Sequence, residues 1–427
     1  MTTRRKPVAS GEELLIPPQP YPKETDPIPI YRIDLALAPS QRYVELARDL
    51  SRELRHTTPV FLELLEWFIP NQYIRSGTIN IMKFLLRGVY DDVQTQEIKG
   101  IAEASGVELY LLVALNVLLD ALLGCTSGAA RVGGGVGDGV GEKGSRLLHF
   151  RTLDWAMDRL RELLVILEFV DSSSEEPQKI VARTVTYAGF VGVLTGVREG
   201  LSISLNFRPS NNSRGFGIRW HQLLVVLGYR PSIASILRDI IFRPRPAHQS
   251  AADVAAELAS TRTSPAYLCL CDGEQASMIE KDLLSGAVRT DSGFVVQTNH
   301  DVSQHESALP KPTEPSATAE ALSAMAKKDA PSNESWVEES AERRQCMIDF
   351  WRERTDVAIG AGTARERAYV LQTELEKKVR TRPISREWTH FRCVMDPQNG
   401  DFTLVERGPP PLPPDQQREL QRAAARR

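Results

Sequence analysis

The chain has 427 residues, of which 42% are hydrophobic and 25% charged, and its formal net charge is −3. This composition is ordinary for a globular protein, and the length allows one large domain or a few smaller ones. A near balance of charges does not favour a surface that neutralises nucleic-acid phosphates, so we expect no nucleic-acid partner.

The five cysteines are few and scattered, and their odd number leaves at least one thiol unpaired. They do not predict a disulfide framework, and they favour a reducing compartment. Cys269 and Cys271 have no second Cys/His pair at metal-ligand spacing, so we expect no metal and no other cofactor. No apolar stretch near the N-terminus has the length of a signal peptide. We therefore expect an intracellular, cytoplasmic protein.

The N-terminal portion is predicted to be mainly helical. Residues 1–27 are rich in proline and polar residues and are predicted to be disordered, and Ile28–Leu37 alternates like a half-buried strand. From Gln41 to Leu123, apolar residues recur three or four positions apart, as they do along a helix. The apolar segment Val107–Leu123 is short for a membrane span and carries Asn116, so we interpret it as a buried helix.

The segment that follows, Gly124–Ser145, is rich in glycine, and we expect no regular element there. Residues 128–145 are predicted to form a flexible insert. Beyond it, short β-like segments predict a mostly antiparallel sheet, covered by helices at Trp220–Tyr229, Ile233–Ile241 and Ala251–Thr261. The expected strands are Arg146–Trp155, Leu163–Val170, Ile180–Tyr187, Leu201–Phe207, Ala266–Cys271, Ser277–Glu280 and Phe294–Thr298.

The last third of the chain begins with residues 302–335, whose Ser/Ala/Pro-rich composition predicts a second flexible insert. Helices are expected at Glu338–Trp351 and near Arg365–Val379. A hairpin turned by Pro397–Gly400 follows, and residues 409–427 are expected to form a flexible tail. The whole pattern predicts an α+β fold in layers.

The sequence Leu123–Ser127, LGCTS, places Cys125 directly after an apolar helix. Taken alone, such a cysteine is more often a small buried hydrophobe than a nucleophile. The segment HFRTLDW adds Arg151 and Asp154, which would ordinarily be a surface ion pair, and VVQTNHD adds Asn299, which would ordinarily be a turn residue.

Together these segments carry a resemblance to the family of acid ceramidase and N-acylethanolamine-hydrolysing acid amidase. The agreement is collinear over most of Ile28–Asp301. It includes the sequences IPIYRIDLAL, EIKGIAEASGVELYLLVALNVLLDALLGCTS, RTLDW, TVTYAGFVGVLTGVREGLSISLN, SPAYLCLCDG and FVVQTNHD. An ordered series of matches is more specific than any single motif.

The resemblance implies an N-terminal-nucleophile hydrolase, with a four-layer αββα sandwich and a precursor that cuts its own backbone. The matching bond here is Gly124–Cys125. Cleavage would give a light chain, residues 28–124 of the ordered protein, and a catalytic heavy chain, residues 125–427. The two chains are expected to stay associated.

The resemblance also implies roles for individual residues. Cys125 would supply the thiolate nucleophile and, through its new α-amino group, the base. Asp154 would orient the ammonium group, and Arg151 would favour the thiolate. Asn299 would donate to the oxyanion, and Arg343 matches an arginine near the family's active site. Expected substrate-binding residues are Tyr187, Ala188, Gly189 and Asn206.

Two departures from the family pattern stand out. Where the family has Asn-Glu-Arg, this chain has Asn206-Phe207-Arg208, so an acidic residue is missing. The absence of an evident signal peptide and of a disulfide pattern departs from lysosomal members, although a lysosomal or vacuolar location is the alternative that the resemblance implies.

We therefore expect a self-activating cysteine amidohydrolase that cleaves N-acyl lipids, either ceramide or N-acylethanolamine. One alternative is an amidase of the same fold for small non-lipid amides, and another is an inactive lipid-binding homologue. Peripheral contact with a membrane is also expected, because the helices Pro59–Ile69 and Ile79–Leu86 are apolar and have Arg75, Lys83 and Arg87 nearby. Core packing is the favoured interpretation for most of those apolar side chains.

Overall fold

Two β-sheets form the centre of this protein, whose fold was obtained as a computed structural model. The structure describes residues 21–57, 72–118, 124–133, 145–155, 157–208, 216–244, 249–302, 333–356 and 369–411.

The larger sheet has eight strands. In spatial order they are β1 (Ile30–Asp34), β4 (Leu164–Val170), β5 (Ile180–Tyr187), β6 (Thr195–Arg198), β7 (Leu201–Phe207), β8 (Ala266–Cys271), β9 (Ala276–Lys281) and β10 (Gly286–Asp291). Strand β1 runs parallel to β4, with Ile30 beside Ile166, and the other neighbours are antiparallel. The N-terminal portion of the chain thus supplies one edge of this sheet.

The smaller sheet has six strands. They are β11 (Phe294–Gln297), β2 (Gly124–Gly133), β3 (Arg146–Asp154), β13 (Thr389–Asp396) and β14 (Asp401–Arg407) in that order, with β12 (Val370–Leu371) also paired to β2. In the β2–β3 ladder Gly124 lies opposite Asp154, and in the β3–β13 ladder Asp154 lies opposite Thr389. The ends of three strands therefore meet beside Cys125.

The helices fall into two groups. The N-terminal portion contributes α1 (Val44–Asp49), α2 (Ser51–Thr57), α4 (Gln72–Leu85), α5 (Asp92–Ser105) and α6 (Leu109–Leu118). The rest of the chain contributes α7 (Phe216–Val226), α8 (Ile233–Phe242), α9 (Ala251–Ser260), α11 (Asn333–Asp356) and α12 (Gln372–Val379). Helix α5 shows why such segments start and stop: the Asp91 carboxylate caps its first turn, and Gly106 ends it with φ +73°.

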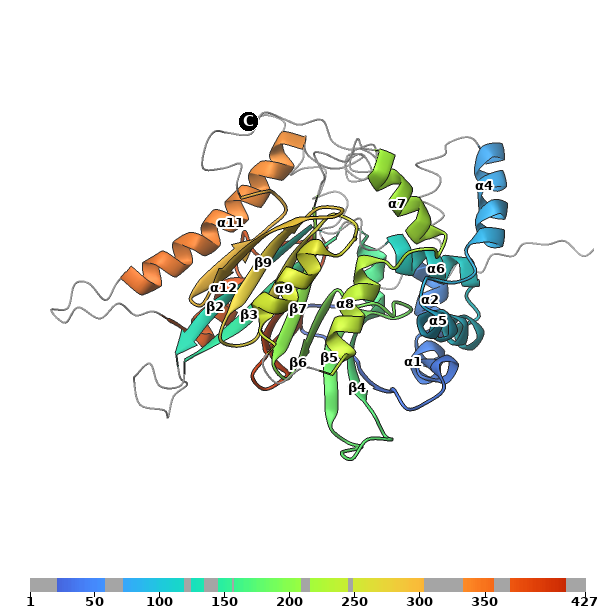
Figure 1. The fold of residues 1–427 in the computed structure, drawn as a ribbon, viewed down its shortest axis with the longest axis horizontal. Helices are drawn as coiled ribbons and strands as arrows, with labels where there is room; N and C mark the ends of the chain where they lie inside the picture. Colours follow the sequence, from blue (N-terminus) through green and yellow to red (C-terminus); the bar gives the residue numbers. More distant parts are fainter. Residues whose placement is uncertain are drawn as a thin grey trace, which may run out of the picture.

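Helices cover the outer face of each sheet (Figure 1). Helices α8 and α9 pack on the larger sheet, while α11 and α12 pack on the smaller one. The two sheets face each other through contacts of β2 with β7 and of β3 with β8. The fold is thus α+β with four layers, helix, sheet, sheet and helix, as the sequence predicts.

Buried polar contacts attach the N-terminal helices to this sandwich. Glu97 on α5 is fully buried, and its carboxylate accepts hydrogen bonds from Arg42 at 3.0 Å and from Arg238 on α8 at 2.7 Å. Nearby, Gln94 donates to Ser235 of α8 at 2.7 Å. Because a buried carboxylate needs such partners, these contacts specify how the two portions dock.

Most predicted strands are confirmed, and β5, β7 and β8 have the predicted bounds. The expectation of a loop from Gly124 is wrong, because residues 124–133 form β2 in the interior of the smaller sheet. The flexible insert predicted at 128–145 therefore cannot begin before residue 134, and residues 134–144 lie outside the described part. Small residues fit here because a Cβ on Gly128 would lie 2.3 Å from the Val295 carbonyl oxygen and 2.4 Å from the Phe150 ring.

Other boundaries also differ from the predictions. Strands β6, β10 and β12 are short and were not predicted. Helix α11 begins at Asn333, which is inside the predicted insert 302–335, and α12 begins only at Gln372. The predicted helix Pro59–Ile69 lies outside the described residues. None of the described helices is both long and apolar enough to cross a membrane.

Candidate active site

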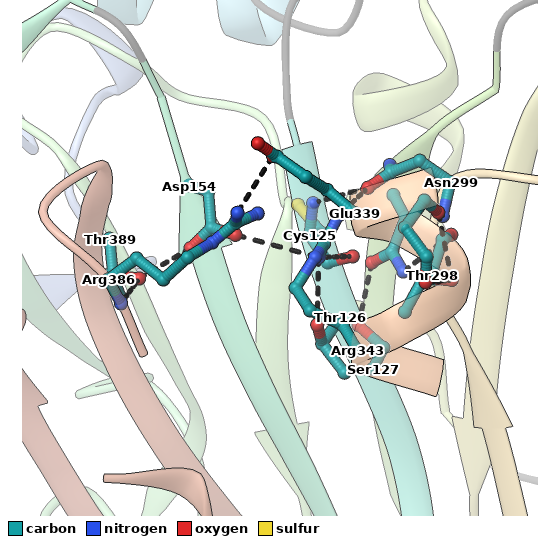
Figure 2. Close-up of polar contacts among 12 residues, drawn as sticks. Cys125, Thr126, Ser127, Asp154, Thr298, Asn299, Glu339, Arg343, Arg386 and Thr389 are labelled. Carbon is teal, nitrogen blue, oxygen red and sulfur yellow. Dashed lines mark hydrogen bonds and ion pairs between the residues drawn. The ribbon is translucent and has the colours of Figure 1, made fainter. Parts of the chain in front are cut away.

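Cys125 is the second residue of β2 and lies at the start of the strand (Figure 2). Its side chain is fully buried, with Sγ 4.0 Å from the Leu205 carbonyl oxygen on β7. Its backbone N–H donates to Oδ1 of Asn299 at 2.9 Å. The thiol therefore occupies the space between the two sheets, and the peptide bond before it is held by a side chain that is distant in sequence.

Arg151 on β3 is the cation nearest the thiol. Its Nη2 lies 3.4 Å from Sγ of Cys125 and donates to the Leu205 carbonyl at 2.7 Å, while Nη1 donates to the Leu194 carbonyl. Burial raises the pKa of Cys125, and the Arg151 guanidinium opposes this by favouring the thiolate. The thiol is thus neutral in the uncut chain and has a permanent positive charge beside it.

Asp154 ends β3 and lies across the ladder from Gly124. Its Oδ1 accepts a hydrogen bond from the Thr389 hydroxyl at 2.6 Å, and its Oδ2 lies 3.5 Å from Nη1 of Arg343. The carboxylate is almost fully buried. A negative charge is therefore held next to the Gly124–Cys125 peptide bond.

Arg343 on α11 connects the other groups. Its Nη1 donates to the Cys125 carbonyl at 2.7 Å and to the Thr126 hydroxyl at 2.8 Å, and Nη2 donates to Oδ1 of Asn299 at 3.0 Å. Burial lowers the pKa of Arg343, but a guanidinium starts so high that it stays charged. Helix α11 thereby binds the backbone at Cys125 and the Thr126 side chain that follows it.

Asn299 follows β11 and has a defined amide orientation. Its Oδ1 accepts from Cys125 and Arg343, so its Nδ2 must be the group that donates to the Phe207 carbonyl at 2.9 Å. Its own backbone N–H donates to Ser340 on α11 at 2.8 Å. The structure thus brings Cys125, Arg151, Asp154, Asn299 and Arg343 together.

Asn206, expected to bind substrate, lies on β7 and contacts Ser127, two residues after Cys125 on β2. Its Oδ1 accepts from the Ser127 hydroxyl at 2.6 Å, and its Nδ2 donates to the Gln297 carbonyl at 3.2 Å. These bonds tie β7 to the smaller sheet. Among the described residues its side chain bonds to Ser127 and to the carbonyls of Gln297 and Thr298, so its observed contacts are structural.

Tyr187 is the last residue of β5, and Ala188 and Gly189 form the turn after it; all three are buried, and Gly189 has φ +91°. The Tyr187 hydroxyl donates to Nδ1 of His390 at 2.7 Å, because the other ring nitrogen faces a carbonyl and must carry the proton. Burial raises the pKa of Tyr187 well above its usual value, and the Arg161 guanidinium opposes this effect. The Tyr187 side chain thus bonds to His390, and the Ala188 N–H donates to the Leu163 carbonyl.

Several site residues were missed by the sequence analysis. Thr126 directly follows the cysteine and could have been noticed, and Ser340 precedes Arg343 by one helical turn. Thr389 and His390 carry no local signal, since they reach Asp154 and Tyr187 only through strand pairing. Among the described residues, no group of three or more His, Cys, Asp or Glu side chains is arranged to hold a metal.

The departure at Phe207 is accommodated by its neighbours. The Phe207 carbonyl accepts from Asn299, and Arg208 forms a two-pronged contact with Asp301 at 2.8 Å for each bond. Asp301 also accepts from Tyr267 at 2.8 Å. A carboxylate is therefore present beside Arg208, although it comes from another segment than in the family pattern.

Comparison with known proteins gives a consistent result. A family model described as the beta subunit of N-acylethanolamine-hydrolyzing acid amidase matches residues 26–88. The chain is 26% identical to acid ceramidase of Heterocephalus glaber over 66% of this chain and 72% of that protein. It is also 26% identical to acid ceramidase of Pan troglodytes over 67% and 73%, respectively.

A solved structure of the Caenorhabditis elegans N-acylethanolamine-hydrolyzing acid amidase (NAAA) ortholog has a TM-score of 0.41 and 21% identity, covering 65% of this chain and 94% of that chain. The family model and the curated relatives point the same way as the motifs around Cys125. The chain is therefore similar in sequence to acid ceramidases and to N-acylethanolamine-hydrolysing acid amidase, which are hydrolases of linear amides.

Proposed function

We propose that this protein cuts its own Gly124–Cys125 bond and then hydrolyses the amide bond of N-acyl lipids, with Cys125 as the nucleophile. The observation that carries the proposal is the convergence of two guanidinium groups, one carboxylate and one carboxamide on a single buried cysteine. A buried thiol that served only for packing would have apolar neighbours instead.

Self-cleavage begins with attack of the Cys125 sulfur on the Gly124 carbonyl carbon. Collapse of the tetrahedral intermediate breaks the C–N bond and leaves a thioester between Gly124 and Sγ, together with a free α-amine on Cys125. Water then hydrolyses the thioester and regenerates the thiol. Arg343 supports this step because it holds the Cys125 carbonyl at 2.7 Å and keeps the backbone in place.

The new α-amine supplies the base for substrate hydrolysis. An α-amino group has a pKa of roughly 7.7–8.0, so it can take the thiol proton near neutrality. Arg151, 3.4 Å from Sγ, favours the thiolate that results. The thiolate attacks the carbonyl carbon of the substrate amide. The amine part of the substrate then leaves with a proton, and water releases the fatty acid from the acyl-thioester.

Asn299 is the proposed oxyanion donor. Its Oδ1 is held by Cys125 and Arg343, which directs its Nδ2 toward the Phe207 carbonyl. Donors fixed in advance in this way stabilise a developing negative charge without reorganisation.

The surface formed by α4 and α7 supports a lipid substrate. Both helices pack on α6 and lie on the same side of the molecule (Figure 1). Phe84 and Tyr73 of α4 are 70% and 80% exposed, and Trp220 of α7 is 48% exposed. Lys83 lies between these aromatic positions of α4 in sequence and is also exposed. Apolar side chains with nearby cations favour peripheral contact with a membrane.

The test combines intact-mass measurement with N-terminal sequencing of the purified protein after incubation at acid and neutral pH, beside Cys125→Ala. We expect a new N-terminus at Cys125, and none in the variant. The cut protein is then given a ceramide, an N-acylethanolamine and a short-chain amide. Preference for the short amide would favour the small-amide alternative, and a chain that stays intact in every condition would favour an inactive lipid-binding protein.

A further inference from the structure

Thr389 makes an unusually well-defined contact with the carboxylate of the site. It is fully buried and lies opposite Asp154 in the β3–β13 ladder. Its Oγ1 is 2.6 Å from Oδ1 of Asp154 and also 2.9 Å from the backbone nitrogen of Arg386 (Figure 2). A backbone N–H can only donate, so the single hydroxyl proton must point at the carboxylate.

The turn that carries the Thr389 hydroxyl is closed by two hydrogen bonds between Arg386 and Thr389. The Thr389 N–H donates to the Arg386 carbonyl at 2.8 Å, while the Arg386 N–H donates to the Thr389 hydroxyl. The Arg386 side chain reaches Glu339 on α11 at 2.7 Å, one turn before Arg343 (Figure 2). Helix α11 therefore contacts both the Cys125 carbonyl, through Arg343, and the turn that positions Asp154, through Glu339.

The other carboxylate oxygen of Asp154 has no such hydrogen-bond donor among the described residues. Oδ2 of Asp154 is buried and accepts no hydrogen bond among the described residues, and its closest cation is Arg343 at 3.5 Å. Gly124 lies across the ladder from Asp154, so cutting the bond after Gly124 creates a new ammonium group nearby. An ammonium has three N–H donors and would satisfy Oδ2.

We propose that Thr389 is a positioning residue: its hydroxyl holds Oδ1 of Asp154 so that Oδ2 faces Arg343 and the α-amine of Cys125. This inference rests on the proposed function, since it assigns Thr389 a part in self-cleavage and in the later hydrolysis. Thr389 does not touch the substrate or the reacting sulfur. It acts through the orientation of Asp154.

Three variants of the full chain test the proposal. Thr389→Val removes the hydroxyl and keeps the branched shape that suits a strand, and Thr389→Ser keeps the hydroxyl. The matched control is Thr186→Val on β5, since the Thr186 hydroxyl is also buried but makes no hydrogen bond among the described residues. If the valine variant does not fold, Thr389→Ala removes the hydroxyl without placing a methyl group against the carboxylate.

The readouts are the first-order rate of appearance of the Cys125 N-terminus by intact mass, and kcat and KM of the cut fraction. We expect Thr389→Val to slow cleavage by roughly 10- to 100-fold, the factor for a hydrogen bond to a charged group, and to lower kcat with little change in KM. Thr389→Ser should stay within a few-fold of wild type, and the control should match wild type.

Two results would overturn the positioning role: wild-type rates in Thr389→Val, or a serine variant as slow as the valine variant, which would indicate packing alone. If the wild-type chain itself is never cut, the proposed function fails and takes this role with it. Thermal unfolding of each variant separates loss of fold from loss of positioning.

Discussion

Cys125 and Cys271 are both fully buried, and both lie between the same two sheets, but their surroundings differ. Cys271 sits with Ala129, Leu147 and Met278 in an apolar cluster, and burial raises its pKa to about 12. Cys125 has Arg151 at 3.4 Å, and Arg343 holds its carbonyl. Burial raises the pKa of Cys125 too, but the two guanidinium groups act in the opposite direction.

The comparison shows that burial alone does not decide what a thiol can do. In an apolar cluster the neutral thiol is the stable form and serves for packing. Beside fixed cations, and next to a peptide bond whose N–H is held by Asn299, the same group can become a nucleophile. Substitutions at these two cysteines and at residues between the sheets test the contrast.

Replacing Cys125 by Ala should abolish both self-cleavage and amide hydrolysis, because it removes the attacking atom in both reactions. Intact mass after prolonged incubation and release of fatty acid from an N-acyl substrate would measure these losses. A cut at the same bond in this variant would show that another group attacks Gly124, and the contrast between the two cysteines would lose its meaning.

Replacing Asn299 by Asp should lower kcat by roughly 100-fold or more, which is the usual cost of one oxyanion donor. The change keeps the Oδ1 acceptor for Cys125 and Arg343 but exchanges the Nδ2 donor for an oxygen. Steady-state kinetics on protein already cut at Cys125 would isolate the effect on hydrolysis. Unchanged kcat would remove Asn299 from the proposed oxyanion site.

His149, which lies between the two sheets, makes the stability of the fold depend on pH. Its ring nitrogens lie 2.9 and 2.8 Å from the Ser202 and Ser204 hydroxyls, and burial lowers its pKa to about 3. The fold requires the neutral ring, so stability is complete above about pH 6.5 and falls as the pH drops toward 3. Between pH 6.5 and 5 we expect a loss of about 2 kcal/mol.

Urea unfolding at these two pH values would measure that loss, and His149→Gln should make it smaller because the titrating group is gone. Some dependence should remain, because burial also lowers the pKa of His390 well below its usual value. Equal slopes in wild type and variant would show that His149 is already charged in the folded protein.

Replacing Cys271 by Ala should have the smallest effect, about 1 kcal/mol of unfolding free energy with an unchanged cleavage rate. Its Sγ lies 3.8 Å from the Leu147 carbonyl oxygen, a weak contact, and the side chain otherwise packs in the apolar cluster. In the folded protein at neutral pH, iodoacetamide should leave Cys271 unmodified. Rapid alkylation of Cys271, detected by peptide mass, would contradict its assignment as a buried thiol in an apolar environment.

Much of the β-structure could be predicted because local patterns and tertiary environment agree there. Segments such as Leu201–Phe207 are apolar and lie between turn residues, and they became strands with the predicted bounds. The glycine-rich start of β2 could not be predicted from local propensity. Its small residues are required by contacts with Phe150 and Val295, which are distant in sequence.

Residue type and order alone were enough to predict the layered α+β class, the family resemblance and the candidate residues Cys125, Arg151, Asp154, Asn299 and Arg343. Only the tertiary structure decided that Thr389 holds Asp154, that Asp301 stands beside Arg208, and that Asn206 binds Ser127. Those contacts join residues more than 75 positions apart. Strand register and helix docking create such contacts, and neither is written in any local pattern.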